Sequence, residues 1–334
     1  MTARRAIIPV FVPHLGCTAN CVFCDQRKIS GSERPATAES VTRAVSEGLA
    51  RIGENTDTQL AFYGGSFTAI PVREQEALLG AALPFLLSKR LRSIRLSTRP
   101  DAIDAETLER LRRCGVKTIE LGAQSMDDEV LRRSGRGHTA AQTEAAARAV
   151  KAAGFELILQ MMTGLPGDTK DKTIATAKRL IALAPDGVRI YPTVIVAGTP
   201  LETLWRRGEY REHTVDEAVD WCAAILPLFE AAGIPVIRLG LNPTEELSGG
   251  EAVAGAYHPA FGELVRSRIL LERAQTLLAD AAPGSEAVLL VHPSDVSAMT
   301  GQHRANLVSL VGAFSLAALK VRAGDVPRGE IRLG

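Results

Sequence analysis

The sequence predicts an α/β protein built on a partial (β/α)6 barrel, with a small α+β extension at its C-terminal end. Two observations predict this fold. Short apolar runs typical of buried strands recur along the chain, and helical patterns lie between them. The strand-like runs are 6–13, 58–64, 92–99, 116–124, 155–164, 186–193 and 234–240, and the helical patterns are about 35–53, 71–90, 104–114, 139–153, 169–184 and 214–232.

The composition is that of a soluble globular protein. The chain has 334 residues, of which 46% are apolar and 23% are charged. Its formal net charge of +1 provides no global basic field for nucleic acid, although a local basic patch would suffice. No apolar run approaches the ~20 residues of a membrane span. We therefore expect a cytoplasmic protein without a membrane partner, in a compartment where thiols stay reduced.

Three of the five cysteines follow the first predicted strand. Cys17, Cys21 and Cys24 lie within eight residues, and the next cysteine is Cys114. Thiolates this close in sequence can hold an iron–sulfur cluster, and three of them leave the fourth iron of a cubane open to an exchangeable ligand. An alternative is a closed zinc site in which His14 is the fourth ligand, as in a zinc-stabilised binding protein. A disulfide would require an oxidising compartment.

Polar or glycine-rich segments also follow the next five predicted strands. The chemistry of such barrels lies where strands end and loops begin, so these segments are expected to meet at one rim. Any one of them is equally explained as an ordinary turn, and only their common placement favours a site. They are Tyr63–Thr68, Ser97–Asp101, Glu120–Ser125, Gln160–Asp168 and Arg189–Thr193.

The sequence pattern predicts a separate C-terminal extension. We expect a barrel over residues 1–245 and an extension over 246–334, joined by a loop at 242–255. The extension is predicted to contain a helix from 255 to about 281, a strand at 286–292, a helix at 303–316 and a last strand at 314–321. Four side chains have no assigned role at this point, namely Cys114, Cys222, His258 and His303.

The cysteine spacing, with Phe23 before the last cysteine, resembles the signature of radical S-adenosylmethionine (SAM) enzymes. This resemblance implies a partial TIM-type barrel. It also implies a 4Fe-4S cluster on Cys17, Cys21 and Cys24, whose open iron chelates SAM, so that His14 is not an iron ligand. In that superfamily the reduced cluster cleaves SAM to methionine and a 5′-deoxyadenosyl radical. The electron would come from a flavodoxin or ferredoxin-type donor.

The same resemblance implies a set of SAM-binding residues at the strand ends. Gly64 and Gly65 match the motif that binds the methionyl amino group, although Ser66 stands where many members have Glu. Arg136 matches an arginine that pairs with the SAM carboxylate; a solvated charge in an arginine-rich run is the alternative. The remaining implied positions are Ser97, Gln124, Gln160 and the backbone at Leu165, with Ser97 and Gln160 replacing carboxylates of several relatives.

Residues 5–245 resemble in particular the radical SAM domain of the Elongator catalytic subunit. The segments that carry this similarity include Asp186–Thr193, Gly198–Leu201 and Leu204–Tyr210. More distantly, the pattern resembles oxygen-independent coproporphyrinogen oxidases. We expect no acetyltransferase domain in the remaining 90 or so residues. The resemblance implies an RNA nucleoside, as in tRNA, as substrate, with a small molecule such as a tetrapyrrole as the alternative.

Overall fold

The protein is described by a computed structural model that covers residues 5–13, 15–17, 19–26, 28, 36–53, 56–241 and 247–334. Its main part is a seven-stranded parallel sheet whose strands lie in the order β1-β2-β3-β4-β5-β6-β8. Within these ranges β1 and β8 form the two edges of the sheet, so the barrel is partial, as predicted. The strands are β1 Arg5–Phe11, β2 Asp57–Tyr63, β3 Ser93–Thr98, β4 Val116–Gln124, β5 Glu156–Thr163, β6 Gly187–Pro192 and β8 Val236–Leu239.

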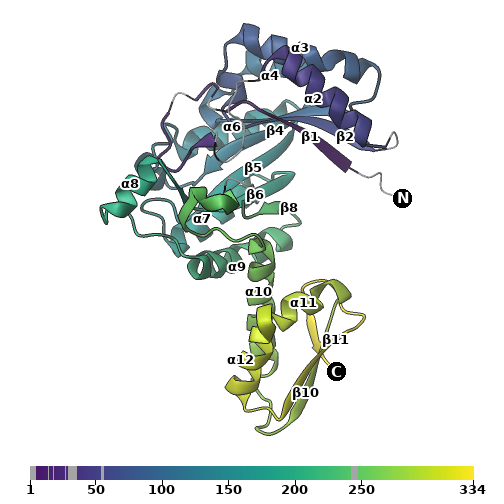
Figure 1. Ribbon diagram of the computed structural model, residues 1–334, viewed down its shortest axis with the longest axis vertical. Helices are drawn as coiled ribbons and strands as arrows, with labels where there is room; N and C mark the ends of the chain where they lie inside the picture. Colours follow the sequence, from purple (N-terminus) through teal and green to yellow (C-terminus); the bar gives the residue numbers. More distant parts are fainter. Residues whose placement is uncertain are drawn as a thin grey trace.

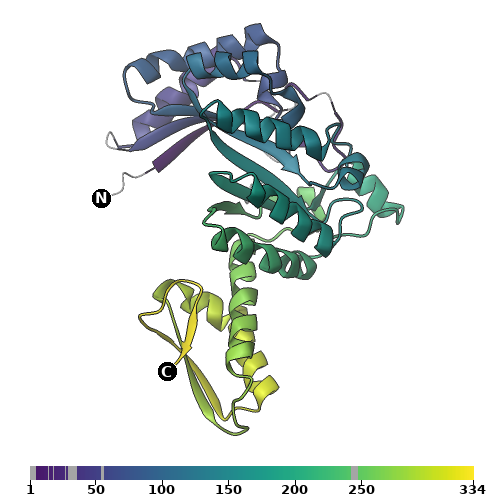
Figure 2. The ribbon, with the colours of Figure 1, turned by 180° about the vertical axis from the view of Figure 1, so that it is seen from behind.

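The crossover helices of the described residues cover one face of this sheet (Figures 1 and 2). The crossover helices are α2 Ala38–Arg51, α3 Val72–Leu87, α4 Ala105–Arg113, α6 Ala140–Ala152, α7 Lys170–Ala182 and α9 Val215–Ala231. Several of these helices begin at a residue whose side chain caps the first helical turn. Thr37, Thr139 and Thr214 each start a capping box, in which side chains satisfy backbone groups of the first helical turn.

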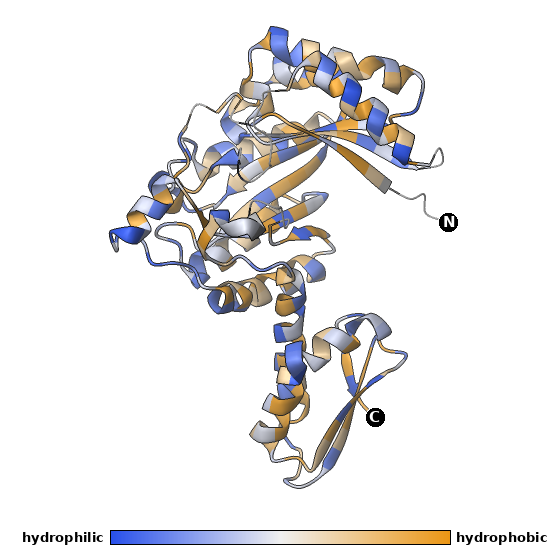
Figure 3. Cartoon of the chain, viewed as in Figure 1, coloured by the Kyte–Doolittle hydropathy of each residue, from blue (hydrophilic) through white to orange (hydrophobic). Residues whose placement is uncertain are grey.

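Side chains alternate between the two faces of each strand. Leu60, Phe62, Leu96 and Leu121 are buried in the core against the helices. Their neighbours on the opposite face include polar groups, which is why blue stretches appear among the largely apolar strands in Figure 3. The inner face of the partial barrel is therefore polar, whereas the helix-covered face holds the hydrophobic core.

The C-terminal extension contains a second, smaller sheet of order β11-β10-β12. One long helix, α10 Phe261–Leu277, leads from the barrel to this sheet (Figure 1). Phe261 and Val265 pack in the barrel core, whereas Ala274 packs in the core of the extension. The other elements are β10 Glu286–Val291, α11 Val296–Thr300, α12 Ala305–Phe314, β11 Ala318–Ala323 and β12 Ile331–Leu333. The boundary at residues 245 and 246 stays a prediction, and α10 contributes to both cores.

Three details of the predicted secondary structure are wrong. The expected loop at 242–255 includes β9 Ala252–Gly255, which pairs with β7 Val194–Val196. The helix expected from 255 begins only at Phe261. The strand expected from Phe314 begins at Ala318, because α12 continues to Phe314 and Ser315 ends it in a left-handed conformation. Two further short helices are α5 Asp128–Arg133 and α8 Pro200–Arg206. None of the helices in the described ranges is both long and apolar enough to cross a membrane.

Candidate active site

The cysteine loop, residues 17–24, lies at the carboxyl edge of the sheet, directly after β1. Its backbone is held from two sides. The Val22 N–H donates to the carbonyl of Ser134 after α5 (3.1 Å), and the carbonyl of Val22 accepts from the N–H of Leu201 in α8 (2.8 Å). Phe23 is buried beside Leu165 in a small apolar cluster of its own. The aromatic residue of the motif therefore anchors the loop.

The three thiols of this loop are free and close enough to influence one another. Cys17 is exposed, whereas Cys21 and Cys24 are half-buried. Burial, together with the charges of Cys21 and Cys17, raises the pKa of Cys24 to about 12. Thiolates of this loop are therefore costly unless a cation lies between them.

The thiols do not converge on a single point. Among the described residues, no group of three His, Cys, Asp or Glu side chains is placed to hold one metal ion. A tetrahedral zinc site requires such convergence, whereas the thiolates of a cubane cluster bind separate irons. His14, the proposed zinc ligand of the alternative, lies outside the described residues.

Arg136 reaches into the cysteine loop. Its Nη1 lies 3.2 Å from the Sγ of Cys21, and its Nη2 donates to the carbonyl of Gly122 in β4 (2.7 Å). Arg132, four residues earlier, has a 71% exposed side chain and pairs with Glu129 on the surface. These two arginines of one run are thus in different environments, and the solvated interpretation fits Arg132 but not Arg136.

Segment 134–138, which faces the cysteine loop, carries unsatisfied polar atoms. Ser134 Oγ, Arg136 Nε and His138 Nδ1 are buried and have no hydrogen-bond partner. Buried groups of this kind are normally paired, so a cluster of them indicates a group that binds there. The residues fit a cluster and a polar ligand in this respect, because the segment that carries the unpaired atoms packs against the cysteine loop at Gly135 and Gly137 and contacts the Cys21 thiol through Arg136.

Gly64 and Gly65 follow β2 and both adopt the left-handed conformation. At Gly65 a Cβ atom would lie 2.3 Å from the carbonyl oxygen of Val12, so no other residue fits without moving the backbone. The Gly65 N–H donates to the side-chain oxygen of Gln26, just after the cysteine loop. The glycine motif and the loop are therefore held together. Gln26 was not predicted as a site residue, although it lies only two residues after Cys24.

Gln124 and Gln160 meet on the inner face of the sheet, where Gln160 Nε2 donates to Gln124 Oε1 (3.3 Å). Gln124 has a φ of 63°, and the pairing of β4 with β5 is irregular between Gly122 and Gln124. A left-handed non-glycine residue is strained, and such strain clusters at functional sites. Gly122 leaves room here, because a Cβ atom on it would lie 2.9 Å from the Gln124 amide nitrogen.

The two remaining predicted SAM-binding residues, Ser97 and Leu165, lie in different surroundings. Ser97 lies on the inner face, opposite Glu120 in the adjacent strand. Leu165 is 2% exposed, so its side chain belongs to the apolar cluster and only its backbone is left to contact a ligand. The turn that contains Leu165 is fixed from one side by Tyr210, whose hydroxyl donates to the carbonyl of Gly164 (2.6 Å).

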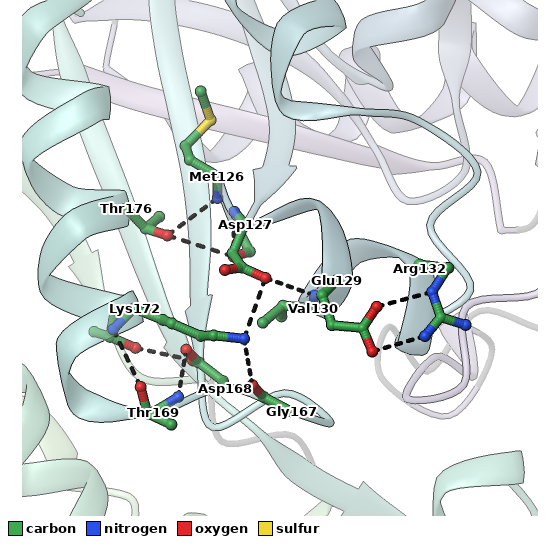
Figure 4. A network of polar contacts seen from close by, with 12 residues as sticks. Met126, Asp127, Glu129, Val130, Arg132, Gly167, Asp168, Thr169, Lys172 and Thr176 are labelled. Atoms are coloured by element: carbon green, nitrogen blue, oxygen red, sulfur yellow. Dashed lines mark hydrogen bonds and ion pairs between the residues drawn. The ribbon is translucent and has the colours of Figure 1, made fainter.

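A polar network fixes the same turn from the other side (Figure 4). Lys172 of α7 donates to the carbonyl of Gly167 (3.1 Å) and to the carboxylate of Asp127 (3.3 Å). Asp127 also caps α5 by accepting from the N–H of Val130 (3.0 Å). Asp168 accepts from the N–H of Gly164 (2.9 Å). The loops after β4 and β5 are therefore held as one unit.

A charged cluster lies on the inner face of the sheet, and the sequence analysis did not identify it. Glu120 is 3% exposed and accepts from Arg95 (3.0 Å) and from Arg189 (2.8 and 3.2 Å). The hydroxyl of Tyr63 lies 3.3 Å from the same carboxylate. Burial and the Glu120 charge raise the pKa of Tyr63, so this hydroxyl stays protonated. The signal was the placement of charged residues at alternate positions of otherwise apolar strands.

Arg99 was also missed as a supporting residue. It is 8% exposed, and its Nη2 donates to the backbone carbonyl of Arg136 (3.2 Å). It therefore positions the backbone that carries Arg136, while its charge, like that of Arg136, opposes the burial-driven rise in the pKa of Cys17. The sequence predicts Ser97 as the site residue of the segment Ser97–Asp101 and gives Arg99 no role.

The four side chains without an assigned role have the following places in the structure. Cys222 is fully buried in the barrel core, where burial raises its pKa to about 12. Cys114 ends α4 and is half-buried. His258 accepts the N–H of Ala260 through Nδ1 just before α10 (3.1 Å). His303 lies in a left-handed turn before α12.

Comparison with known proteins shows where this arrangement recurs. The sequence profile of the radical SAM superfamily matches residues 11–180, and that of the Radical_SAM C-terminal domain matches residues 185–270. The chain belongs to the radical SAM superfamily. Membership supports an enzyme rather than the alternative of a non-catalytic zinc-stabilised binding protein. Radical SAM enzymes use a 4Fe-4S cluster and SAM, so both predicted cofactors are those of the family.

Two groups of relatives are similar to this radical SAM protein. A tRNA uridine(34) acetyltransferase from Methanocaldococcus infernus is 26% identical over 66% of this chain and 48% of its own length. Elongator complex protein 3 from Homo sapiens is 28% identical over 65% of this chain and 47% of its own length. The chain thus spans about half the length of these relatives. The similarity to the Elongator catalytic subunit, inferred from sequence motifs, is confirmed.

Solved structures confirm the fold. The archaeal Elp3 of Methanocaldococcus infernus, with an N-terminal deletion, superposes with a TM-score of 0.64 at 21% identity, over 80% of this chain and 63% of that one. HydG, a maturase of the [FeFe]-hydrogenase, superposes with a TM-score of 0.56 at 15% identity, over 79% of this chain and 55% of that one.

Proposed function

We propose that Cys17, Cys21 and Cys24 hold the 4Fe-4S cluster of this radical SAM enzyme and that SAM binds beside it along the carboxyl edge of the sheet. The observation that carries the proposal is the contact of Arg136 with Cys21, which joins the cysteine loop to β4. When bound and reduced, the cluster supplies the electron that cleaves SAM to methionine and a 5′-deoxyadenosyl radical. A flavodoxin or ferredoxin-type protein is the proposed electron donor.

The residues of this chain have distinct tasks in that proposal. Gly64 and Gly65 expose backbone groups to the methionyl amino group, and Arg136 donates to the methionyl carboxylate. Gln124, supported by Gln160, orients polar groups of the ligand, and the Ser97 hydroxyl serves the ribose. The backbone at Leu165 lies along the adenine, in the turn that Tyr210 and Lys172 hold in place.

The proposed substrate is an RNA nucleoside, as in tRNA. The names of the relatives favour this class, and so does the distribution of exposed arginines. The loop residue Val22 bonds to α5 on one side and to α8 on the other, so both helices flank the cysteine loop. Arg133 and Arg207 are exposed at the ends of these helices, where they can contact phosphates next to the site.

The cofactor part is tested by anaerobic reconstitution with iron and sulfide. The wild-type protein is expected to turn brown, to bind iron, and to release 5′-deoxyadenosine from SAM in the presence of dithionite. The triple variant Cys17→Ala, Cys21→Ala, Cys24→Ala should do none of these. Cys222→Ala is the matched control, because that cysteine is buried far from the loop and should leave iron content unchanged. Full iron loading of the triple variant would refute the assignment.

The substrate part is tested by binding of purified tRNA at low and at moderate salt. Arg133→Gln with Arg207→Gln should weaken binding at low salt and reduce its salt dependence. Arg332→Gln, an exposed arginine of the C-terminal sheet, is the control. Nucleoside mass spectrometry of a deletion strain should show a missing modification. Absence of tRNA binding together with an unchanged nucleoside profile would favour a small-molecule substrate such as a tetrapyrrole.

A further inference from the structure

The charged cluster on the inner face carries more positive than negative charge. Two guanidinium groups, of Arg95 and Arg189, share the single carboxylate of Glu120. Arg238 of β8 lies opposite Arg189 in the strand register and donates to the carbonyls of Gly240 (2.9 Å) and Leu241 (2.8 Å), which carry no formal charge. Among the described residues of this cluster, three positive charges stand against one negative charge, an excess of +2.

The carboxylate of Glu120 is already saturated. One of its oxygens accepts from Arg95 and Arg189, with the Tyr63 hydroxyl also within reach, and the other accepts from Arg189 alone. It has little capacity left for a ligand, since a carboxylate offers about four acceptor positions. Its effect is to fix the planes of two guanidinium groups, each of which has five N–H donors. The group that the cluster can still bind is therefore an acceptor.

The cluster borders the proposed SAM site at the level of Ser97 and Gln160, which lie farther from the carboxyl edge of the sheet than Gln124. Glu120 is opposite Ser97, and Arg189 is opposite Gln160, in neighbouring strands. The side chains of Arg95, Arg189 and Glu120 are 11%, 14% and 3% exposed, so the charges are largely shielded from water. Excess positive charge in such surroundings attracts an anion more strongly than the same charge on a surface.

We propose that Arg95 and Arg189, positioned by Glu120, form an oxyanion-binding site for the substrate next to SAM. Arginine pairs recognise the oxygens of phosphate and carboxylate groups through paired N–H donors. This step rests on the proposed function, in which the oxyanion is the phosphate of the target nucleotide. The site would bring a substrate carbon close to SAM by holding the anionic group one layer away.

The test measures binding to the reconstituted enzyme in the presence of SAM, at fixed ionic strength. The probes are uridine 5′-monophosphate and uridine, which differ only in the phosphate, and propionate and propionamide, which have the same carbon skeleton and differ in whether they end in a charged carboxylate or a neutral amide. The wild-type enzyme is expected to bind the monophosphate at least about tenfold more tightly than the nucleoside. Arg189→Gln and Arg95→Gln should remove most of this difference. Arg132→Gln, on the surface of α5, should not.

Glu120→Gln separates an electrostatic role from a structural one. The amide in Glu120→Gln keeps one acceptor oxygen to position the guanidinium groups and removes the negative charge, so an anion-binding cluster should keep or increase its preference for the monophosphate. If the network serves folding alone, Glu120→Gln should behave like the arginine variants. The charge-retaining Arg189→Lys should keep part of the preference, and thermal unfolding of each variant shows whether it is folded.

Each result of these binding measurements supports or contradicts a different part of the proposal. Equal affinity for monophosphate and nucleoside, together with equal affinity for propionate and propionamide, would overturn the oxyanion site. A preference for propionate alone would overturn the phosphate as its ligand. A preference for the monophosphate in an enzyme that fails to bind tRNA would support the site and contradict RNA as the substrate. A parallel loss in Glu120→Gln and Arg189→Gln would overturn the proposal in favour of a structural role.

Discussion

Replacement of Arg136 by Ala is the most direct test of the proposed SAM site. The guanidinium of Arg136 is fixed by two contacts, to the Sγ of Cys21 (3.2 Å) and to the carbonyl of Gly122 (2.7 Å), and its Nε is buried without a partner. A charged donor held in this way loses little conformational freedom when it pairs with the SAM carboxylate. Hydrogen bonds that involve a charged group contribute about 1.5–3 kcal/mol.

This magnitude corresponds to about a tenfold to hundredfold loss of SAM affinity in Arg136→Ala. Titration calorimetry of reconstituted enzyme measures it directly, with iron content determined in parallel so that loss of the cluster is recognised. Arg136→Lys keeps the charge but not the forked geometry, so an intermediate affinity is expected. Arg132→Ala is the matched control, because this arginine belongs to the same run but is 71% exposed.

The reasoning is refuted if Arg136→Ala retains its iron and binds SAM as tightly as the wild type or the Arg132→Ala control. In that case the contact with Cys21 would serve only to hold the loop. A second readout then decides this point, because a loop-holding arginine should be needed for stability. Unfolding of Arg136→Ala by urea, compared with Arg132→Ala, would show a selective loss of stability.

Three further predictions concern the cluster, the pH dependence and the support of the adenine turn. The triple variant of the cysteine loop is expected to contain no iron after reconstitution, whereas Cys222→Ala retains it, as measured by iron analysis. Burial lowers the pKa of His213 from 6.5 to about 4, so its contribution to stability is present above pH 6.5 and is lost as the pH falls toward 4. Urea unfolding should show about 2 kcal/mol less stability at pH 5 than at pH 7 from this group, and His213→Asn should remove that part of the difference. Lys172→Met removes two hydrogen bonds of the network in Figure 4 and should lower the free energy of unfolding by about 1–2 kcal/mol, while an unchanged value would exclude Lys172 as a support of the turn.

The sequence predicted the barrel well because its signal is periodic. Each strand places apolar residues such as Leu60 and Leu121 against helices, and this alternation is visible without any structure. Short strands such as β7 and β9 were not predicted, because they pair with each other across more than fifty residues. Pairing at that distance depends on where the barrel places the two segments, so the local composition of each segment does not indicate it.

The proposed site was predictable to the extent that it consists of loop motifs. The cysteine loop and the glycine motif each require particular residues at fixed spacing, so a short stretch of sequence reveals them. Arg95, Glu120 and Arg189 come from three different strands, and only the strand order brings them together. Arg136 is an intermediate case, because its run contains three arginines and only the structure distinguishes the inward one from Arg132.

The loop motifs could be predicted from the sequence and the charged cluster could not, because the two layers of the barrel are stabilised in different ways. At the carboxyl edge, ligand-facing groups are held by backbone geometry, as in the left-handed turn at Gly65, and these requirements leave a local pattern. One layer deeper, the groups are held by mutual charge pairing around Glu120, and any carboxylate with two cations on neighbouring strands would meet the requirement. The edge can therefore keep one chemistry across a superfamily, while the deeper layer can change its charges to suit another substrate. On this argument, substitutions that alter substrate choice without affecting SAM cleavage should fall on the inner faces of β3, β4 and β6.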